Sequence, residues 1–228
     1  MKLFLFLTAM VFTSAGYCQD CAGYYFLQNN KTIEMTIFGK KGNVTARQVY
    51  TVRDVKKSGG VTTGHLNSEM SDEKGKLIAK SSAIVQCDGG IMKIDMKMNM
   101  PPNPNGDPGP VGETDVKMDK VYVEYPSNMN VGDNLKDASM AMDMDNKNGM
   151  KQSVSMELNN RKVEAKEKIT TSAGTWDCFK ISFKSKMKIK TMGIGIPVNI
   201  DGTEWFAPGF GIVKSESKHG RTEITSVK

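Results

Sequence analysis

Apolar and polar residues alternate at a period of two through much of this chain, most clearly between Trp176 and Lys190. The apolar residues that share one side of an extended strand there are Phe179, Ile181, Phe183, Met187 and Ile189. The residues that share the other side are Lys180, Lys184, Lys186, Lys188 and Lys190. Because successive side chains of a strand point to opposite faces, the pattern predicts a long β-ribbon with one apolar and one cationic face.

The same pattern recurs along the chain as extended segments that are separated by turns rich in Gly, Asn, Asp and Lys. The predicted strands span residues 32–38, 44–55, 61–70, 77–87, 91–98, 116–125, 135–144, 150–158, 161–170, 175–190, 198–206, 211–217 and 221–227. Glycine, Asn and Asp tolerate the positive φ of tight hairpin turns, and sequential strands tend to pair. We therefore predict an all-β protein: a large curved antiparallel sheet, half-barrel or sandwich-like, with meander connectivity and few or no helices.

Residues 101–110 interrupt this pattern with five prolines. Proline has no backbone N–H to donate to a β-ladder, so this run predicts an exposed loop. Neither half of the chain looks self-sufficient, which favours a long loop over a linker between domains. We expect a single antiparallel β domain over residues 20–228.

The first residues have the pattern of a secretory signal. A short basic start, Met1-Lys2, precedes an apolar run from Leu3 to Ala15 that is too short to span a bilayer. We predict a signal peptide over residues 1–19 and a periplasmic or secreted protein with no transmembrane segment. Cys18 leaves an outer-membrane lipoprotein as an alternative, although Tyr17 is larger than the small residue that lipoprotein signals favour.

The distribution of charge and the cysteines bear on nucleic-acid binding and on disulfide formation. The net charge is +6, but lysines and acids are interspersed, which indicates a solvated sheet face and not a nucleic-acid-binding surface. Export permits a disulfide among Cys18, Cys21, Cys87 and Cys178, although the spacing does not say which pair forms. Cys178 lies inside a predicted strand and is interpreted as structural.

No motif of an enzyme is present. The sequence has no Gly-x-Ser-x-Gly elbow, no His-Glu-x-x-His and no phosphate-binding glycine loop, and we predict no catalytic residues and no cofactor.

Seventeen methionines are the compositional oddity of the chain. Two clusters have a spacing of two, namely Met92, Met96, Met98 and Met100, and Met140, Met142 and Met144. Thioethers bind soft cations such as Cu(I), but methionine also fills irregular apolar space and adapts to hydrophobic ligands. Because any buried strand face requires apolar residues at this spacing, we favour a core or ligand pocket and predict no metal site.

The chain resembles a known family of exported proteins over nearly all of its predicted mature length. The resemblance is strongest over residues 161–216, with the phrase EWFAPGFGIVKSE at Glu204 to Glu216 as its most specific part. YPSNM at Tyr125 to Met129, VGD at residues 131–133 and the opening Asp20-Cys21 agree with it. These phrases resemble the TapB-like family of exported bacterial proteins of unknown function. The resemblance implies a curved, half-barrel β domain like that of periplasmic lipoprotein carriers, and it implies no catalytic residues.

Together these observations predict an exported, non-enzymatic binding protein of the cell envelope that holds a hydrophobic ligand or partner segment on its concave face. The candidate lining residues are Phe179, Phe183, Met187, Met96, Met98, Met142 and Trp176. The partners left open are a lipid or another envelope protein, with no nucleic acid. The alternatives are a structural or assembly protein of the envelope, whose sheet edges pair with another chain, and soft-metal binding through the methionine clusters.

Overall fold

The computed structural model describes residues 21–99, 121–145, 151–191 and 194–228. The predicted signal peptide, Cys18, Met100 and the proline run at 101–110 lie outside the described residues.

The described residues form twelve strands and three single-turn 3-10 segments. The strands are β1 (Thr32–Gly39), β2 (Val44–Ser58), β3 (Val61–Asp72), β4 (Leu77–Asp88), β5 (Ile91–Asp95), β6 (Tyr122–Pro126), β7 (Ala138–Asp145), β8 (Lys151–Thr171), β9 (Gly174–Thr191), β10 (Ile194–Ala207), β11 (Gly211–Ser217) and β12 (Gly220–Val227). The 3-10 segments are η1 (Cys21–Gly23), η2 (Tyr25–Leu27) and η3 (Met96–Asn99). The all-β prediction is therefore confirmed.

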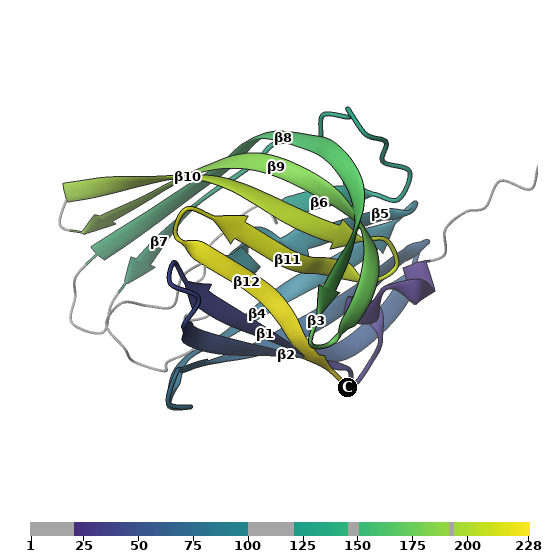
Figure 1. Ribbon diagram of the computed structural model, residues 1–228, viewed down its shortest axis with the longest axis horizontal. Helices are drawn as coiled ribbons and strands as arrows, with labels where there is room; N and C mark the ends of the chain where they lie inside the picture. The colour runs from purple at the N-terminus through teal and green to yellow at the C-terminus, as the bar shows by residue number, and fades with distance from the viewer. Residues whose placement is uncertain (1–20, 100–120, 146–150, 192–193) are drawn as a thin grey trace, which may run out of the picture.

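All twelve strands belong to one sheet, in the order β6-β5-β4-β3-β2-β1-β12-β11-β10-β9-β8-β7. Each described ladder is antiparallel. Strands β1 and β12, the first and last along the chain, pair with each other from Ile33↔Val227 to Gly39↔Gly220. The two edges of the sheet are thus β6 and β7, which follow each other in the chain. The sheet curls into a nearly closed barrel with a seam between these edges (Figure 1), and the predicted meander is confirmed.

Several predicted boundaries differ from the structure, among them the start of β10, and two of the differences have a clear local cause. The segments predicted at 150–158 and 161–170 are one strand, β8, which continues through a bulge where Asn160 has a φ of 54°. Strand β5 ends at Asp95, whose side-chain Oδ1 accepts a hydrogen bond from the backbone N–H of Lys97 at 2.9 Å. This Asx-type turn leads into η3, so Met96 and Met98 do not occupy alternate positions of a strand as predicted.

A short segment at the N-terminal side packs into one end of the barrel. Phe26 of η2 contacts the rings of Tyr50 and Phe210, and the preceding Tyr24 packs near Phe206. A Cβ at Gly211 would lie 2.8 Å from the Phe26 ring, so glycine there makes room for it. We call residues Cys21–Leu27 the plug; it is the purple segment at the right of Figure 1.

One disulfide holds the plug in place. Cys21 of η1 is bonded to Cys87 of β4, and both residues are buried. The bond links positions 66 residues apart, so it removes considerable freedom from the unfolded chain.

We predict that the double substitution of Cys21 and Cys87 by Ser lowers the free energy of unfolding by about 2–4 kcal/mol, because the closed loop is long. Urea unfolding followed by tryptophan fluorescence measures the change. Dithiothreitol should destabilise the wild type to the same degree and leave the double variant unaffected. An equal response of both proteins to the reductant would contradict the assignment.

Candidate functional site

The inner face of the barrel is apolar, and its burial changes along the barrel axis. On β9, Phe179 is 6% exposed and Ile181 is fully buried, whereas Phe183, Met187 and Ile189 are only partly buried. The fully buried part lies toward the plug, and the partly buried part lies toward the opposite end. Near the plug the inner face of β9 is therefore a packed core, and farther away the described residues leave it partly uncovered. On the neighbouring strand β8, Val154, Met156 and Leu158 lie opposite this second part and are buried, so the incomplete burial is confined to β9 and β10.

The other candidate lining residues lie in different places. Met96 is fully buried in the main core, and Met98 is partly buried and packs against that core. Trp176 packs against the main core and also against a second cluster, so it does not belong to the inner face alone. Met142 lies in β7, but its side chain is outside the described residues. The structure thus brings Phe179, Phe183, Met96 and Met98 to one core.

The seam is closed by the segment that connects β6 to β7, rather than by a ladder between these strands. The backbone N–H groups of Gly132 and Leu135 donate to the carbonyls of Val163 and Arg161, both at 2.8 Å. The N–H of Val163 donates back to the carbonyl of Asp133 at 2.9 Å. Residues 132–135 therefore run along β8 next to its bulge.

At this point the side chain of Arg161 turns into the barrel. Its Nη1 donates to the backbone carbonyls of Glu124 at 3.0 Å and Lys136 at 3.1 Å, and its Nη2 donates to Oε1 of Glu204 at 3.2 Å. The hydroxyl of Tyr125 donates to both carboxylate oxygens of Glu204, each at 3.1 Å. We call Arg161, Glu204 and Tyr125 the clasp, because they join β8, β10 and β6 across the seam.

Aromatic packing completes the clasp. The guanidinium carbon of Arg161 lies 4.7 Å from the centre of the Tyr125 ring. Tyr125 also stacks on Phe206, with the ring centres 4.5 Å apart and an angle of 4° between the ring planes. The Arg161 side chain has no solvent exposure and that of Glu204 is 8% exposed, so the ion pair is almost free of solvent screening.

The clasp shifts the titration of its members. Burial raises the pKa of Tyr125 well above its ordinary value, and the negative charge of Glu204 raises it further, although Arg161 opposes this. Burial would lower the pKa of Arg161, but the neighbouring Tyr125 and Glu204 outweigh it, and the pKa is raised. Arg161 is thus a fixed cation and Tyr125 a fixed hydrogen-bond donor. The arrangement joins three strands across the seam and so holds the barrel closed.

Sequence reasoning missed the clasp, although two signals were present. Glu204 alternates with Phe206 along its strand, which places a carboxylate on an apolar face where it needs a partner. Asn159 and Asn160 just before Arg161 interrupt the alternation of apolar residues, which is typical of a bulge. Neither signal identifies the partner strand.

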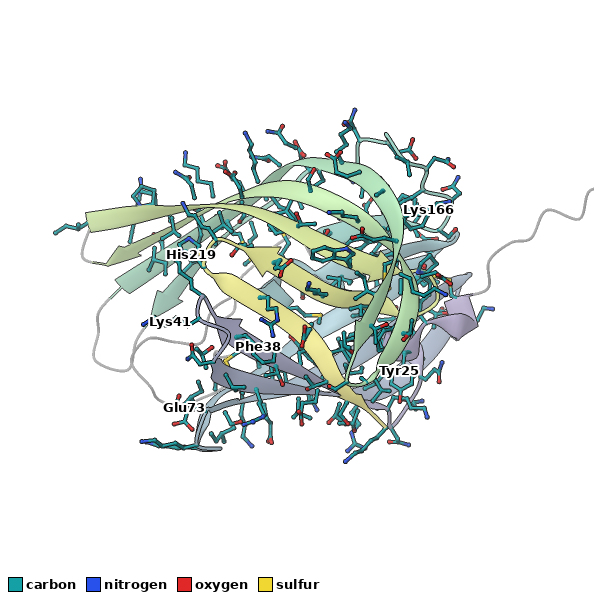
Figure 2. The ribbon with its side chains drawn as sticks, viewed as in Figure 1. Tyr25, Phe38, Lys41, Glu73, Lys166 and His219 are labelled. Carbon is teal, nitrogen blue, oxygen red and sulfur yellow. A yellow bond between two sulfur atoms is a disulfide. The ribbon has the colours of Figure 1, made fainter. Side chains whose placement is uncertain are left out.

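A second apolar cluster contains the free cysteine and lies on the outer face. Its buried residues are Cys178, Trp205, Ala207 and Val213. Trp205 Nε1 donates to Oε1 of Glu167, and Lys214 Nζ lies 4.6 Å from the centre of a Trp205 ring. A pocket of about 480 Å³ beside this cluster is lined by Lys166, Glu167, Lys168, Asp177, Cys178, Phe179 and Pro208; Lys166 is labelled in Figure 2.

The thiol in this pocket is not activated. Burial, together with the carboxylates of Asp177 and Glu167, raises the pKa of Cys178 to about 12. The thiolate, which is the nucleophilic form, is therefore scarce at neutral pH.

Two further kinds of feature are missing from the parts of the chain that the structure describes. They contain no cluster of three or more His, Cys, Asp or Glu residues that could hold a metal ion. Across the same residues, no helix is both long and apolar enough to cross a membrane.

Fold and site define an antiparallel, nearly closed barrel with an apolar interior, a plug at one end and a charged clasp at its seam. Residues 28–228 match the DUF3108-like family, and the chain belongs to that family. The family found is thus DUF3108-like, and the finer resemblance to TapB-like proteins stays a prediction. No curated protein matches the chain.

Two solved structures share the fold. One is described as a "putative lipoprotein" from Parabacteroides distasonis ATCC 8503; it has a TM-score of 0.71 and 22% identity, over 92% of this chain and 100% of that one. The other is described as a "putative exported protein with YmcC-like fold" from Bacteroides fragilis NCTC 9343; it has a TM-score of 0.66 and 23% identity, over 88% of this chain and 96% of that one.

We predict that Arg161→Met lowers the free energy of unfolding by about 3–5 kcal/mol, because it leaves the buried carboxylate of Glu204 without its cation. Lys80→Met is the matched control: Lys80 pairs with Glu69 at 2.6 Å, but both side chains are about half exposed. The control should cost less than about 1 kcal/mol. Urea unfolding measures both, and equal losses would contradict a special role for the clasp.

We also predict that Cys178 reacts with iodoacetamide far more slowly in the folded protein than in urea at the same pH, because its thiol is buried and its pKa is raised to about 12. Mass spectrometry of the alkylated protein measures the rate. Folding raises the pKa of Cys178, so the protonated thiol favours the folded protein, and this contribution is fully present at pH values below the pKa of Cys178 in the unfolded chain. It is lost as the pH rises through the pKa of Cys178 in the folded protein. Rapid alkylation of the folded protein at neutral pH would contradict the buried position.

Proposed function

We propose that this protein is an exported, non-enzymatic binding protein of the cell envelope. Its inner face holds a hydrophobic ligand, or an apolar segment of another envelope protein. The observation that carries this proposal is the incomplete burial of the inner face at the end away from the plug. Phe183, Met187 and Ile189 of β9, with Val198 and Ile200 of β10, are apolar residues on that face that stay partly exposed.

Two features of this region suit an apolar ligand. Methionine is flexible and polarisable, so Met187 can adapt to ligands of differing shape. A Cβ at Gly202 would lie 2.4 Å from Cζ of Phe183, so the Phe183 ring occupies the space above this glycine and adds apolar surface next to β10. Apolar contact contributes roughly 25 cal/mol per Å² of buried surface, and one acyl chain against this face could bind without any ionic contact.

A polar group lies among these residues. The Oγ of Ser185 is buried on the inner face of β9, between Phe183 and Met187, and has no hydrogen-bond partner among the described residues. A buried hydroxyl without a partner costs free energy that a bound ligand could recover. Ligand sites commonly combine an apolar lining with a few such polar groups, so Ser185 would orient a ligand's carbonyl or hydroxyl.

Export of this chain is part of the same proposal. It rests on the predicted signal peptide and on the two structural relatives, whose descriptions are of an exported protein and a lipoprotein.

We predict that the fluorescent probe 1-N-phenylnaphthylamine binds the wild type and binds Met187→Glu at least about tenfold more weakly, because a charge on the inner face must be desolvated. Lys186→Glu, one residue away on the outer face, is the matched control and should bind as the wild type does. Equal affinities for the two variants would overturn the inner-face assignment.

Native mass spectrometry on protein purified from its own host separates the candidate functions. A co-purifying lipid supports the proposal. A stoichiometric copper adduct would support soft-metal binding instead, and neither would support a structural role in the envelope.

A further inference from the structure

The hairpin of β9 and β10 projects from the body of the barrel at the end opposite the plug (Figure 1). Its last described pair is Ile194↔Thr191. Ile194 is 75% exposed, the highest value among the large hydrophobic residues that are described. A single exposed apolar residue needs no explanation by itself. At this tip, however, it is combined with a row of lysines.

Four lysines of β9 lead up to the tip on the outer face: Lys184, Lys186, Lys188 and Lys190. None of them forms an ion pair within the described residues. The acids opposite this row are Glu157, across from Lys186, and Asp201, across from Lys184. The two lysines nearest the tip have no acid opposite them, because their ladder partners are Ser153, Ser155, Gly195 and Pro197.

Local packing directs these two lysines along the hairpin. A Cβ at Gly195 would lie 2.6 Å from Cε of Lys188 and 2.8 Å from Cγ of Lys190. Both aliphatic stems therefore cross onto β10 beside the tip. With a rise of about 3.4 Å per residue, Lys190 lies about 3 Å and Lys188 about 10 Å behind the level of Ile194.

The same end of the barrel carries other lysines at its turns. Lys40 and Lys41 lie between β1 and β2, and Lys218 lies between β11 and β12; all three are exposed. Figure 2 labels Lys41 and the neighbouring His219. Between β3 and β4, Glu73 is flanked by Lys74 and Lys76. The turns at this end of the barrel, which lie behind the projecting tip, are thus mostly basic.

From this geometry we propose that the β9–β10 tip is a docking site for a membrane surface that contains anionic phospholipid. Ile194 enters the boundary between headgroups and acyl chains, which lies about 5–10 Å below the surface for peripheral elements. The amines of Lys188 and Lys190 then reach the phosphates, while their stems stay along the apolar region. This docking also brings the partly exposed inner face of β9 and β10 next to the bilayer, but it does not depend on ligand binding there.

Vesicle co-sedimentation tests the proposal. The wild type should bind phosphatidylcholine vesicles that contain about one third phosphatidylglycerol, and bind pure phosphatidylcholine far more weakly. Lys188→Gln with Lys190→Gln should lower the partition coefficient about thirtyfold, since each lysine near an anionic surface contributes about a factor of five. Ile194→Ser should lower it at least about threefold, because its apolar side chain no longer enters the bilayer.

The matched control is Lys56→Gln with Lys57→Gln. These lysines are exposed on β2 at the plug end, so the variant has the same net charge but keeps the tip intact. It should bind within about twofold of the wild type, since the charges lie beyond a Debye length from the docked surface. All variants are compared in the same form of the protein, so a lipid anchor would contribute equally to the vesicle binding of each.

Two results would overturn the proposal. One is an equal loss for both lysine pairs, which would indicate a response to net charge alone. The other is that Ile194→Ser binds vesicles as well as the wild type does and that the wild type binds soluble dextran sulfate as tightly as it binds anionic vesicles. That result would indicate a general polyanion-binding surface. Naphthylamine binding, measured without vesicles, should be the same in all these variants, so failure here is distinct from failure of the ligand-binding proposal.

Discussion

A sheet of twelve strands has two edges, and this fold depends on how they are joined. The edges β6 and β7 do not pair with each other, so the seam is closed by backbone hydrogen bonds between residues 132–135 and β8 and by the buried guanidinium of Arg161. Arg161 reaches two backbone carbonyls and one carboxylate in three directions, which a lysine could not do with comparable geometry. Because a buried cation requires a counter-charge, Glu204 must be present, and Tyr125 satisfies its remaining acceptors.

The strands could be predicted from sequence because apolar residues alternate with polar ones along many of them. In β9 every apolar residue from Phe179 to Ile189 falls at a period of two, so a single local rule suffices. The clasp could not be predicted, because its members lie on β6, β8 and β10 and an arginine in a strand usually indicates a solvent-facing position. The same limit applies to Met96 and Met98, where one side chain, Asp95, ends the strand that their spacing suggested.

The two ends of the barrel differ in what fixes them. At one end, the plug is held by the disulfide to β4 and by aromatic contacts of Phe26 and Tyr24. The clasp lies near this end, since Glu204 pairs with the fully buried Ile181. Covalent, ionic and packing constraints therefore coincide over one part of the interior, which accounts for its complete burial.

Beyond the clasp these constraints end. Strand β6 begins only at Tyr122, and among the described residues β7 has β8 as its sole ladder partner. The ribbon of β7 to β10 continues into the sheet through β11, and on its other side residues 132–135 hydrogen-bond to β8 beside Arg161. In this region Phe183, Met187 and Ile189 of β9 stay partly exposed, whereas Ile181 on the same strand is buried. On β8, which pairs with this part of β9, Val154, Met156 and Leu158 are buried. The change from full to partial burial along β9 thus falls just beyond the level of the clasp, because Ile181 pairs with Glu204 and Phe183 is the next residue on the inner face.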